Sequence, residues 1–176
     1  NESMGLIEMV DNVRTIRDIM LAYLQLQGRR FDFGKVKSLL GDPFMALEDK
    51  LRNFKKLKEM YQPVLQIWFA DRFPNPVNWY EARNRYTRSC AVMSIVGYLL
   101  GMGDRHGDNI LLNELTGQIL HVDFDCLFDK GKKLRVPERV PFRLTQNMTA
   151  AMGVNGYEGT FRRTCEVTMR LIRQNE

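Results

Sequence analysis

Cysteine and histidine are both scarce in this chain of 176 residues, which has three cysteines and two histidines. The cysteines are Cys90, Cys126 and Cys165, and no two of them form a Cys-x-x-Cys pair. An odd number of widely spaced cysteines argues against a disulfide scaffold and leaves no ligand set for a structural zinc ion. We therefore expect a reducing, intracellular setting for this protein.

Long apolar runs and runs of one charge are also missing. No apolar stretch reaches the roughly 20 residues that a membrane-spanning helix needs, so we expect no membrane segment. The net charge of +5 favours anionic partners, but the basic residues form no continuous run, and direct nucleic-acid binding does not follow. The length and the 44% hydrophobic content fit one globular domain or a piece of one.

Helical periodicity dominates the parts of the chain outside the central region. Asp11 can cap a first helix that Gly28 ends, and Asn75 can cap a long helix with Pro76 in its first turn. The expected order is an extended segment over 1–10, a helix over 11–27, an irregular basic segment over 28–42, helices opening at Pro43 and at Pro63, the long helix over 76–101, and two closing helices over 145–152 and 157–174.

The long helix leads into two predicted strands. Its second half, residues 91–100, is apolar on every side, which indicates a helix in the middle of a domain. Residues 110–112 and 118–122 alternate as two short strands joined by a turn, and they predict a β-hairpin. The fold class is therefore α+β and predominantly α-helical, with a small β-hairpin. A long loop over 125–141 follows the hairpin, and loops of this length in compact domains are usually functional.

The most informative motif is Gly-Asp-Arg-His-Gly-Asp-Asn over 103–109. A second motif, His-Val-Asp-Phe-Asp, follows over 121–125. Four residues separate Asp104 from Asn109, and the hairpin returns Asp123 beside them. Phosphoryl transfer from a metal-bound nucleotide uses such groups: one carboxylate meets the attacking hydroxyl, and an amide and a second carboxylate hold magnesium. We assign the first role to Asp104 and the metal ligands to Asn109 and Asp123.

The residues around these three allow more than one role. His106 either donates to the transferred phosphoryl group, braces Asp104 or is structural; Arg105 either reaches a phosphate or pins the loop to a neighbouring carboxylate. We include both among the catalytic candidates. His121 is expected to be structural, and the basic stretch 130–133 either steers an anionic substrate or is a solvated face.

These motifs resemble the phosphatidylinositol-3-kinase-related protein kinases over nearly the whole chain. The stretch 103–109 is similar to the family's catalytic loop, and 123–125 stands where its Asp-Phe-Gly stands, with Asp125 in place of the glycine. Val-Pro-Phe-Arg-Leu-Thr over 140–145 and the stretch 153–163 resemble the end of its activation loop and the segment that follows. Residues 86–94 and 121–131 are similar to ATR-type DNA-damage checkpoint kinases, especially the fungal members.

The resemblance implies that the chain is the C-terminal lobe of a kinase domain. The N-terminal lobe and a short C-terminal segment of the FATC type are expected to lie outside it, so the lobe alone is expected to be inactive. The implied parts are a hinge over 1–10, a catalytic loop over 104–109, an activation loop over 123–145 and C-terminal helices over 146–176. The implied ATP-binding residues are Glu8, Met9 and Val10 at the hinge and Leu111 and Val122 on the pocket floor.

The same resemblance implies an activity and a setting. The activity is phosphorylation of serine or threonine followed by glutamine, with ATP and Mg²⁺ as cofactors. The setting is the nucleus, with an obligate ATRIP-type regulatory subunit bound through regions outside this chain. Two alternatives remain open, because a phosphoinositide lipid kinase has nearly the same catalytic loop and a kinase-shaped scaffold has the same fold.

Overall fold

The computed structural model describes residues 6–42, 44–134 and 137–175, and it is predominantly helical with one small sheet. The α+β class predicted from the sequence is confirmed. The elements in chain order are β1 (Val13–Thr15), α1 (Ile16–Leu26), α2 (Phe33–Leu40), α3 (Leu47–Met60), α4 (Leu65–Arg72), α5 (Pro76–Leu99), β2 (Ile110–Asn113), β3 (Ile119–His121), a 3-10 turn η1 (Lys130–Lys133), α6 (Gln146–Ala151) and α7 (Thr160–Gln174).

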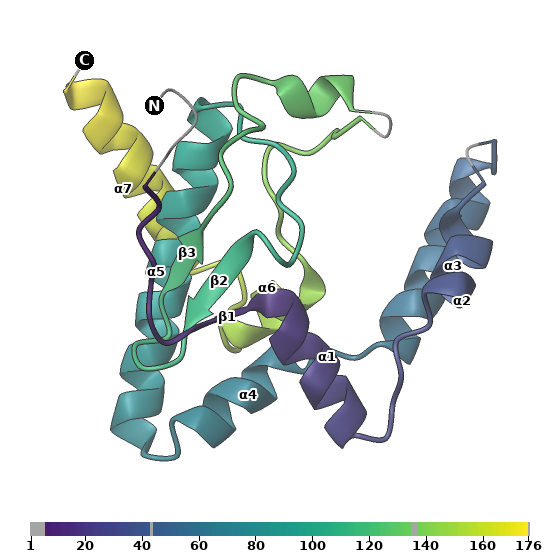
Figure 1. The fold of residues 1–176 in the computed structure, drawn as a ribbon, viewed down its shortest axis with the longest axis horizontal. Coiled ribbons are helices and arrows are strands. Elements are labelled where there is room, and N and C mark those ends of the chain that lie inside the picture. The colour runs from purple at the N-terminus through teal and green to yellow at the C-terminus, as the bar shows by residue number, and fades with distance from the viewer. Residues whose placement is uncertain (1–5, 43, 135–136, 176) are drawn as a thin grey trace.

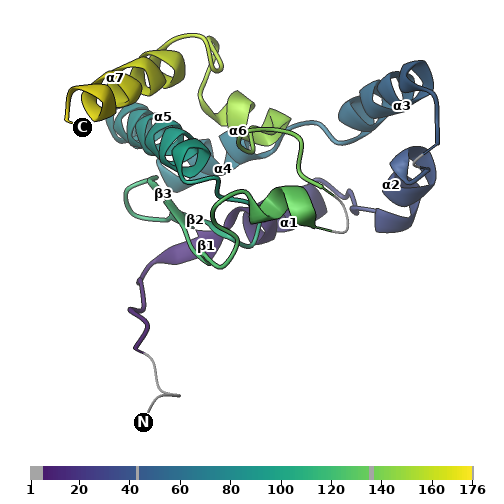
Figure 2. The same cartoon turned by 90° about the horizontal axis from the view of Figure 1, so that it is seen from above.

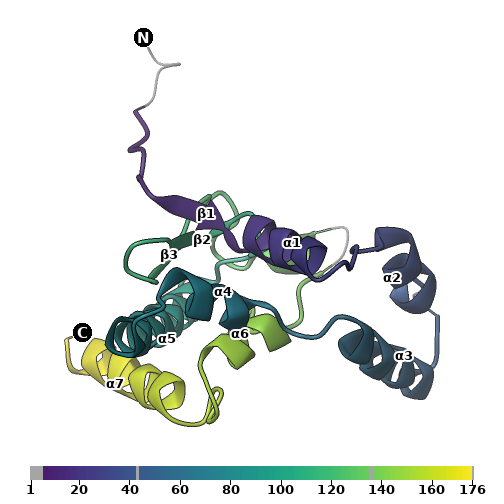
Figure 3. The same cartoon turned by 90° about the horizontal axis from the view of Figure 1, so that it is seen from below.

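The helix α5 lies between two layers (Figures 1 and 3). The sheet lies on one side of it and α7 on the other (Figure 2). Asn75 caps α5 by accepting from the backbone N–H groups of Val77 and Asn78, and Pro76 occupies its first turn, as the sequence predicts. The core around α5 is built from fully buried aromatic and aliphatic side chains, which include Trp68, Phe69, Tyr86, Ile110 and Leu112.

The sheet has three antiparallel strands in the order β1-β2-β3. The predicted hairpin is confirmed as β2 and β3, but the predicted helix start at Asp11 is wrong. Val13–Thr15 pair with β2, where Val13 faces Asn113, and this pairing keeps the backbone extended. The helix α1 begins only at Ile16, because Thr15 is its N-cap and accepts from the backbone N–H of Asp18.

A helical hairpin of α2 and α3 projects from the rest of the molecule (Figure 1). The sequence predicts an irregular segment over 28–42, and the structure instead has α2 there, capped by Asp32, which accepts from the backbone N–H of Lys35. The predicted second helix exists as α3 but begins at Leu47; the proposed start at Pro43 lies outside the described residues. Large apolar side chains on this hairpin are exposed, Phe44 almost completely.

The loop after β3 is anchored to the end of α5. The backbone N–H groups of Phe128 and Asp129 donate to the carbonyl oxygens of Leu100 and Gly101, each at 2.9 Å. These bonds place the 3-10 turn η1 and the predicted activation loop beside the segment that leads into residues 103–109 (Figure 1). No helix in the described part of the chain is long and apolar enough to cross a lipid bilayer.

Candidate active site

The predicted catalytic loop leaves α5 and is tied to the segment after β3. Gly103 is buried, and its backbone N–H donates to the carbonyl oxygen of Cys126 at 2.7 Å. The backbone N–H of Val122 donates to the carbonyl oxygen of Asn109 at 3.1 Å. Asp104 and Asp123 both have left-handed backbones, with φ of 56° and 61°, a conformation that aspartate tolerates better than most residues. Two short loops are thus held side by side.

Asn109 connects the two carboxylates that the sequence assigns to chemistry. Its Nδ2 donates to the backbone carbonyl of Asp104 at 3.0 Å and lies 3.5 Å from Oδ2 of Asp123. Asn109 is buried, whereas the side chain of Asp104 is half exposed and Asp123 is exposed. The structure therefore brings the three predicted residues together, with both acids open to a ligand.

Arg105 does not reach outward toward a phosphate position. It is 7% exposed, and it donates to the carbonyl oxygens of Gly103 at 2.9 Å, of Val122 at 2.7 Å and of Asp123. Of the two roles considered from the sequence, pinning the loop fits this geometry, although the partners are backbone carbonyls rather than a carboxylate. Burial lowers the pKa of Arg105, and the carboxylates of Asp123 and Asp104 act against that shift.

His106 lies on the exposed side of the loop, beside Asp104. Its Nδ1 accepts from the backbone N–H of Asp108 at 3.3 Å, so the neutral ring carries its proton on Nε2. This Nε2 lies 3.9 Å from Oδ2 of Asp104, too far for a hydrogen bond. The ring therefore does not brace Asp104 in this structure, and its Nε2–H remains available to a ligand.

Arg17 fixes the loop from the side of α1, and a second residue near the site, His121, is buried in the sheet. Arg17 pairs with Asp108 at 2.9 Å, and its backbone N–H donates to the carbonyl oxygen of Gly107. No local pattern in the sequence points to Arg17, because it is far from the loop along the chain. His121 is buried, and burial, with a further contribution from Arg105, lowers its pKa to about 4. A neutral buried imidazole fits the structural role expected for it.

The predicted nucleotide-binding residues fall into two groups. Leu111 lies on the face of β2 opposite the buried Ile110 and Leu112, and Val122 follows β3 directly, where its backbone N–H bonds to Asn109. The hinge residues Glu8, Met9 and Val10 belong to an exposed segment, 6–12, that extends away from the sheet (Figures 2 and 3). The structure therefore brings the floor residues to the site and leaves the hinge residues apart from it; residues 1–5 of the predicted hinge lie outside the described part.

The donor set at the site suits magnesium and not a softer metal. Within the described ranges, no group of three or more His, Cys, Asp or Glu side chains could hold a metal ion by itself. Asn109 and Asp123 offer an amide oxygen and a carboxylate, because the nitrogen of Asn109 already donates to Asp104. Proteins commonly bind Mg²⁺ together with a nucleotide through one or two oxygen ligands of their own, and phosphate oxygens complete the coordination.

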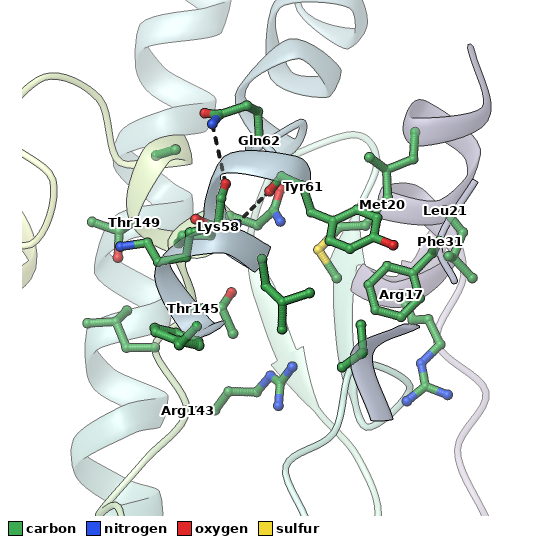
Figure 4. A pocket seen from close by; sticks show the side chains of 18 of the residues that line it. Arg17, Met20, Leu21, Phe31, Lys58, Tyr61, Gln62, Arg143, Thr145 and Thr149 are labelled. Carbon is green, nitrogen blue, oxygen red and sulfur yellow. Dashed lines mark hydrogen bonds between the residues drawn. The ribbon is translucent and has the colours of Figure 1, made fainter. Parts of the chain in front are cut away.

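A large cavity lies outside this site, between α1, α3 and the segment around α6 (Figure 4). Its volume is about 1020 Å³, and the rings of Phe31 and Tyr61 meet on its wall with their centroids 4.8 Å apart. Arg17 lines this cavity and also pairs with Asp108 of the predicted catalytic loop.

The model of one protein family, "Phosphatidylinositol 3- and 4-kinase", matches residues 1–176. The chain belongs to this kinase family. The resemblance noted from the motifs at 103–109 and 121–125 is therefore confirmed.

Several named relatives in this family are protein kinases. Serine/threonine-protein kinase MEC1 of Eremothecium gossypii is 52% identical over 99% of this chain and 7% of its own length. Protein kinase rad3 of Schizosaccharomyces pombe is 47% identical over 100% of the chain and 7% of its own length, and serine/threonine-protein kinase ATR of Drosophila melanogaster is 47% identical over 99% and 7%. The chain thus spans about 7% of the length of these kinases.

The fold is also that of solved kinases of the family. The structure described as "FAT and kinase domain of CtTel1" superimposes with a TM-score of 0.88 and 35% sequence identity, over 97% of this chain and 12% of that chain.

Proposed function

We propose that this chain is the C-terminal lobe of an ATP- and magnesium-dependent serine/threonine protein kinase of the DNA-damage checkpoint type, which phosphorylates serine or threonine followed by glutamine. The observation that carries the proposal is the position of Asn109, 3.0 Å from the backbone carbonyl of Asp104 and 3.5 Å from the carboxylate of Asp123. The names of the relatives, which are serine/threonine kinases, favour a protein substrate over a lipid.

Each polar residue has a distinct task in this proposal. The exposed carboxylate of Asp104 orients the substrate hydroxyl and accepts its proton, a role that is typically worth about 10²–10⁴-fold in rate. Asn109 and Asp123 hold Mg²⁺, which neutralises charge on the ATP phosphates when it is bound. His106 offers its Nε2–H to the transferred phosphoryl group, and Arg105 keeps the two loops in register.

The nucleotide would lie over the exposed face of the sheet. Leu111 and Val122 form the apolar floor there, and the backbone of Glu8, Met9 and Val10 meets adenine once the hinge segment folds toward the site. By resemblance to checkpoint kinases, we further propose a nuclear location, protein substrates and an ATRIP-type regulatory subunit that binds outside this chain.

The test is phosphate transfer by the full-length protein with its regulatory subunit, in magnesium and ATP, to a peptide containing Ser-Gln. We expect activity in the wild type and a loss of about 10²–10⁴-fold in Asp104→Ala. The matched control is Asp49→Ala, which removes a partly exposed aspartate on α3 far from the site. A peptide with alanine in place of the glutamine reports the sequence preference.

The alternatives predict different results in the same assay. A lipid kinase would transfer phosphate to phosphatidylinositol vesicles and not to the peptide. The exposed lysines of η1 are the feature that could suit such a headgroup, yet Lys132 pairs with Asp129 at 2.8 Å and Lys130 donates to the carbonyl of Asp125 at 3.1 Å. A folded protein with no transfer to either substrate would be a scaffold, and the proposal would be wrong.

A further inference from the structure

Glu138, near the end of the predicted activation loop, contacts the backbone of the proposed catalytic aspartate, Asp104. Its Oε1 accepts the backbone N–H of Asp104 at 2.8 Å, although the two residues are 34 positions apart. The backbone N–H of Glu138 in turn donates to the carbonyl oxygen of Gly131 at 3.1 Å. The carboxylate is therefore held in the loop and directed at one peptide unit of the catalytic loop.

Two glycines leave the space that this carboxylate occupies. A Cβ atom at Gly103 would lie 2.6 Å from Oε2 of Glu138, and a Cβ atom at Gly131 would also collide with the same oxygen. The two glycines face each other, since a Cβ at Gly103 would lie 2.8 Å from the Cα of Gly131. The close approach, and not an unusual backbone angle, is thus the reason for glycine at 131.

The bond to Glu138 holds the strained backbone of Asp104 and does not involve the Asp104 carboxylate. Asp104 has a φ of 56°, in the left-handed region where a non-glycine residue needs support from its surroundings. The side chain of Asp104 remains half exposed, so the N–H bond to Glu138 fixes the backbone and leaves the carboxylate for substrate. On the other side of the same peptide, Nε of Arg105 donates to the carbonyl oxygen of Gly103 at 2.9 Å.

We propose that Glu138 is a positioning residue for Asp104: its carboxylate holds the backbone N–H of Asp104 and thereby sets where the Asp104 carboxylate meets the substrate hydroxyl. This inference rests on the proposed function, because it assigns Glu138 a task only if Asp104 acts on substrate. A bond to an ionised acceptor is among the stronger hydrogen bonds, so it is suited to this task.

The first experiment measures the bond itself in the full-length protein and needs no activity. Amide hydrogen exchange of peptides that contain Asp104 is compared in the wild type, Glu138→Ala and Glu138→Gln. We expect much faster exchange at Asp104 in Glu138→Ala and only slightly faster exchange in Glu138→Gln, whose amide oxygen still accepts in a weaker bond. Unchanged exchange in Glu138→Ala would overturn the proposal, whatever the enzyme phosphorylates.

The second experiment is kinetic and uses the Ser-Gln peptide. We expect Glu138→Ala to lower kcat by about 10²-fold, the loss that a misplacement of about 1 Å can cause, with the KM for ATP unchanged. Glu138→Gln should stay within about threefold of the wild type, because a neutral acceptor keeps the bond in weaker form. A merely structural role would not produce this pattern, in which kcat falls in Glu138→Ala while the KM for ATP and the activity of Glu138→Gln stay close to the wild type.

Two glycine variants complete the test. Gly131→Ala keeps Glu138 in the chain, but the added Cβ displaces its carboxylate. We therefore expect this variant to show the same fast amide exchange at Asp104 and the same lowered kcat as Glu138→Ala. The control is Gly97→Ala within α5, where the added Cβ meets Met102 at an ordinary 3.7 Å. Glu166→Ala, an exposed glutamate on α7, controls for loss of a carboxylate. An active wild type with a fully active Glu138→Ala would contradict the inference and leave the proposed function standing.

Discussion

The Nη1 atom of Arg105 donates a hydrogen bond to the carbonyl oxygen of Val122 across 2.7 Å. Arg105 belongs to the proposed catalytic loop. Val122 follows β3 directly before Asp123, to whose carbonyl the Nη2 atom of Arg105 donates. One planar side chain therefore sets the spacing between the loop that carries Asp104 and the residue proposed to hold the metal. A guanidinium suits this position because its donors lie in a fixed fork.

We expect Arg105→Lys to lower kcat for the Ser-Gln peptide by about 10²-fold, since one ammonium group cannot span the two carbonyls and the loops lose their register. The matched control is Arg85→Lys on α5, whose side chain pairs with Glu81 on the surface and should leave kcat unchanged. Steady-state kinetics of the full-length protein measure both. A wild-type kcat in Arg105→Lys would show that the fork is not needed.

Asp123 is proposed as a metal ligand, and this makes a prediction about magnesium. We expect Asp123→Asn to raise the half-saturating Mg²⁺ concentration at least about tenfold. Mutation of residues that only hydrogen-bond to metal ligands already lowers metal affinity by this factor. The fold should be intact because the carboxylate is exposed. Asp125→Asn, two residues away, is the control and should change the magnesium requirement far less. An Asp123→Asn protein that fails to fold would make Asp123 structural.

Local signals in the sequence were sufficient for the hairpin, for α5 and for the proximity of Asp104, Asn109 and Asp123. Asn109 and Asp123 meet because a hairpin of fixed length joins them, and Asn75 caps α5 within its own turn. These features depend on neighbours along the chain, which is why spacing and composition could predict them.

The features that could not be predicted depend on contacts between distant segments. Residues 13–15 form a strand and not a helix because β2, almost 100 residues later, pairs with them. The roles of Arg17 and Glu138 follow from bonds to Asp108 and to Asp104 that no local pattern contains. Helical periodicity misled at 11–15, since tertiary pairing overrides a local preference.

Asn147 at the start of α6 supplies such a distant contact to α4. Its Oδ1 accepts the backbone N–H groups of Val64 at 2.8 Å and Leu65 at 3.2 Å, whereas the N-cap position of α4 offers no side-chain bond of its own. The cap therefore comes from a residue that is more than 80 positions away.

We expect Asn147→Ala to speed amide hydrogen exchange in α4 about 5- to 30-fold, equivalent to the roughly 1–2 kcal/mol that loss of a cap costs. Asn147→Asp should keep the protection, because its carboxylate still accepts and is favoured at a helix N-terminus. Exchange of α4 peptides in the full-length protein measures both variants. Equal exchange in Asn147→Ala and the wild type would show that α4 does not need this cap.

The buried His121 predicts how the stability of the sheet depends on pH. Burial, with a contribution from Arg105, lowers its pKa in the folded protein to about 4, from an ordinary value of 6.5. The folded state therefore binds fewer protons than the unfolded state between these values, so stability is complete above about pH 6.5 and falls as the pH drops toward 4. The slope is at most about 1.4 kcal/mol per pH unit.

We expect the protection of β3 amides, corrected for intrinsic exchange, to decrease between about pH 7 and pH 5 in the wild type. His121→Leu cannot be protonated there and should show a smaller decrease over the same range. The substitution also removes the Nδ1 atom of His121, which is buried without a hydrogen-bond partner among the described residues. An identical pH dependence in the two proteins would mean that His121 is not the group whose protonation loosens the sheet, and that its ring is solvated in the folded state.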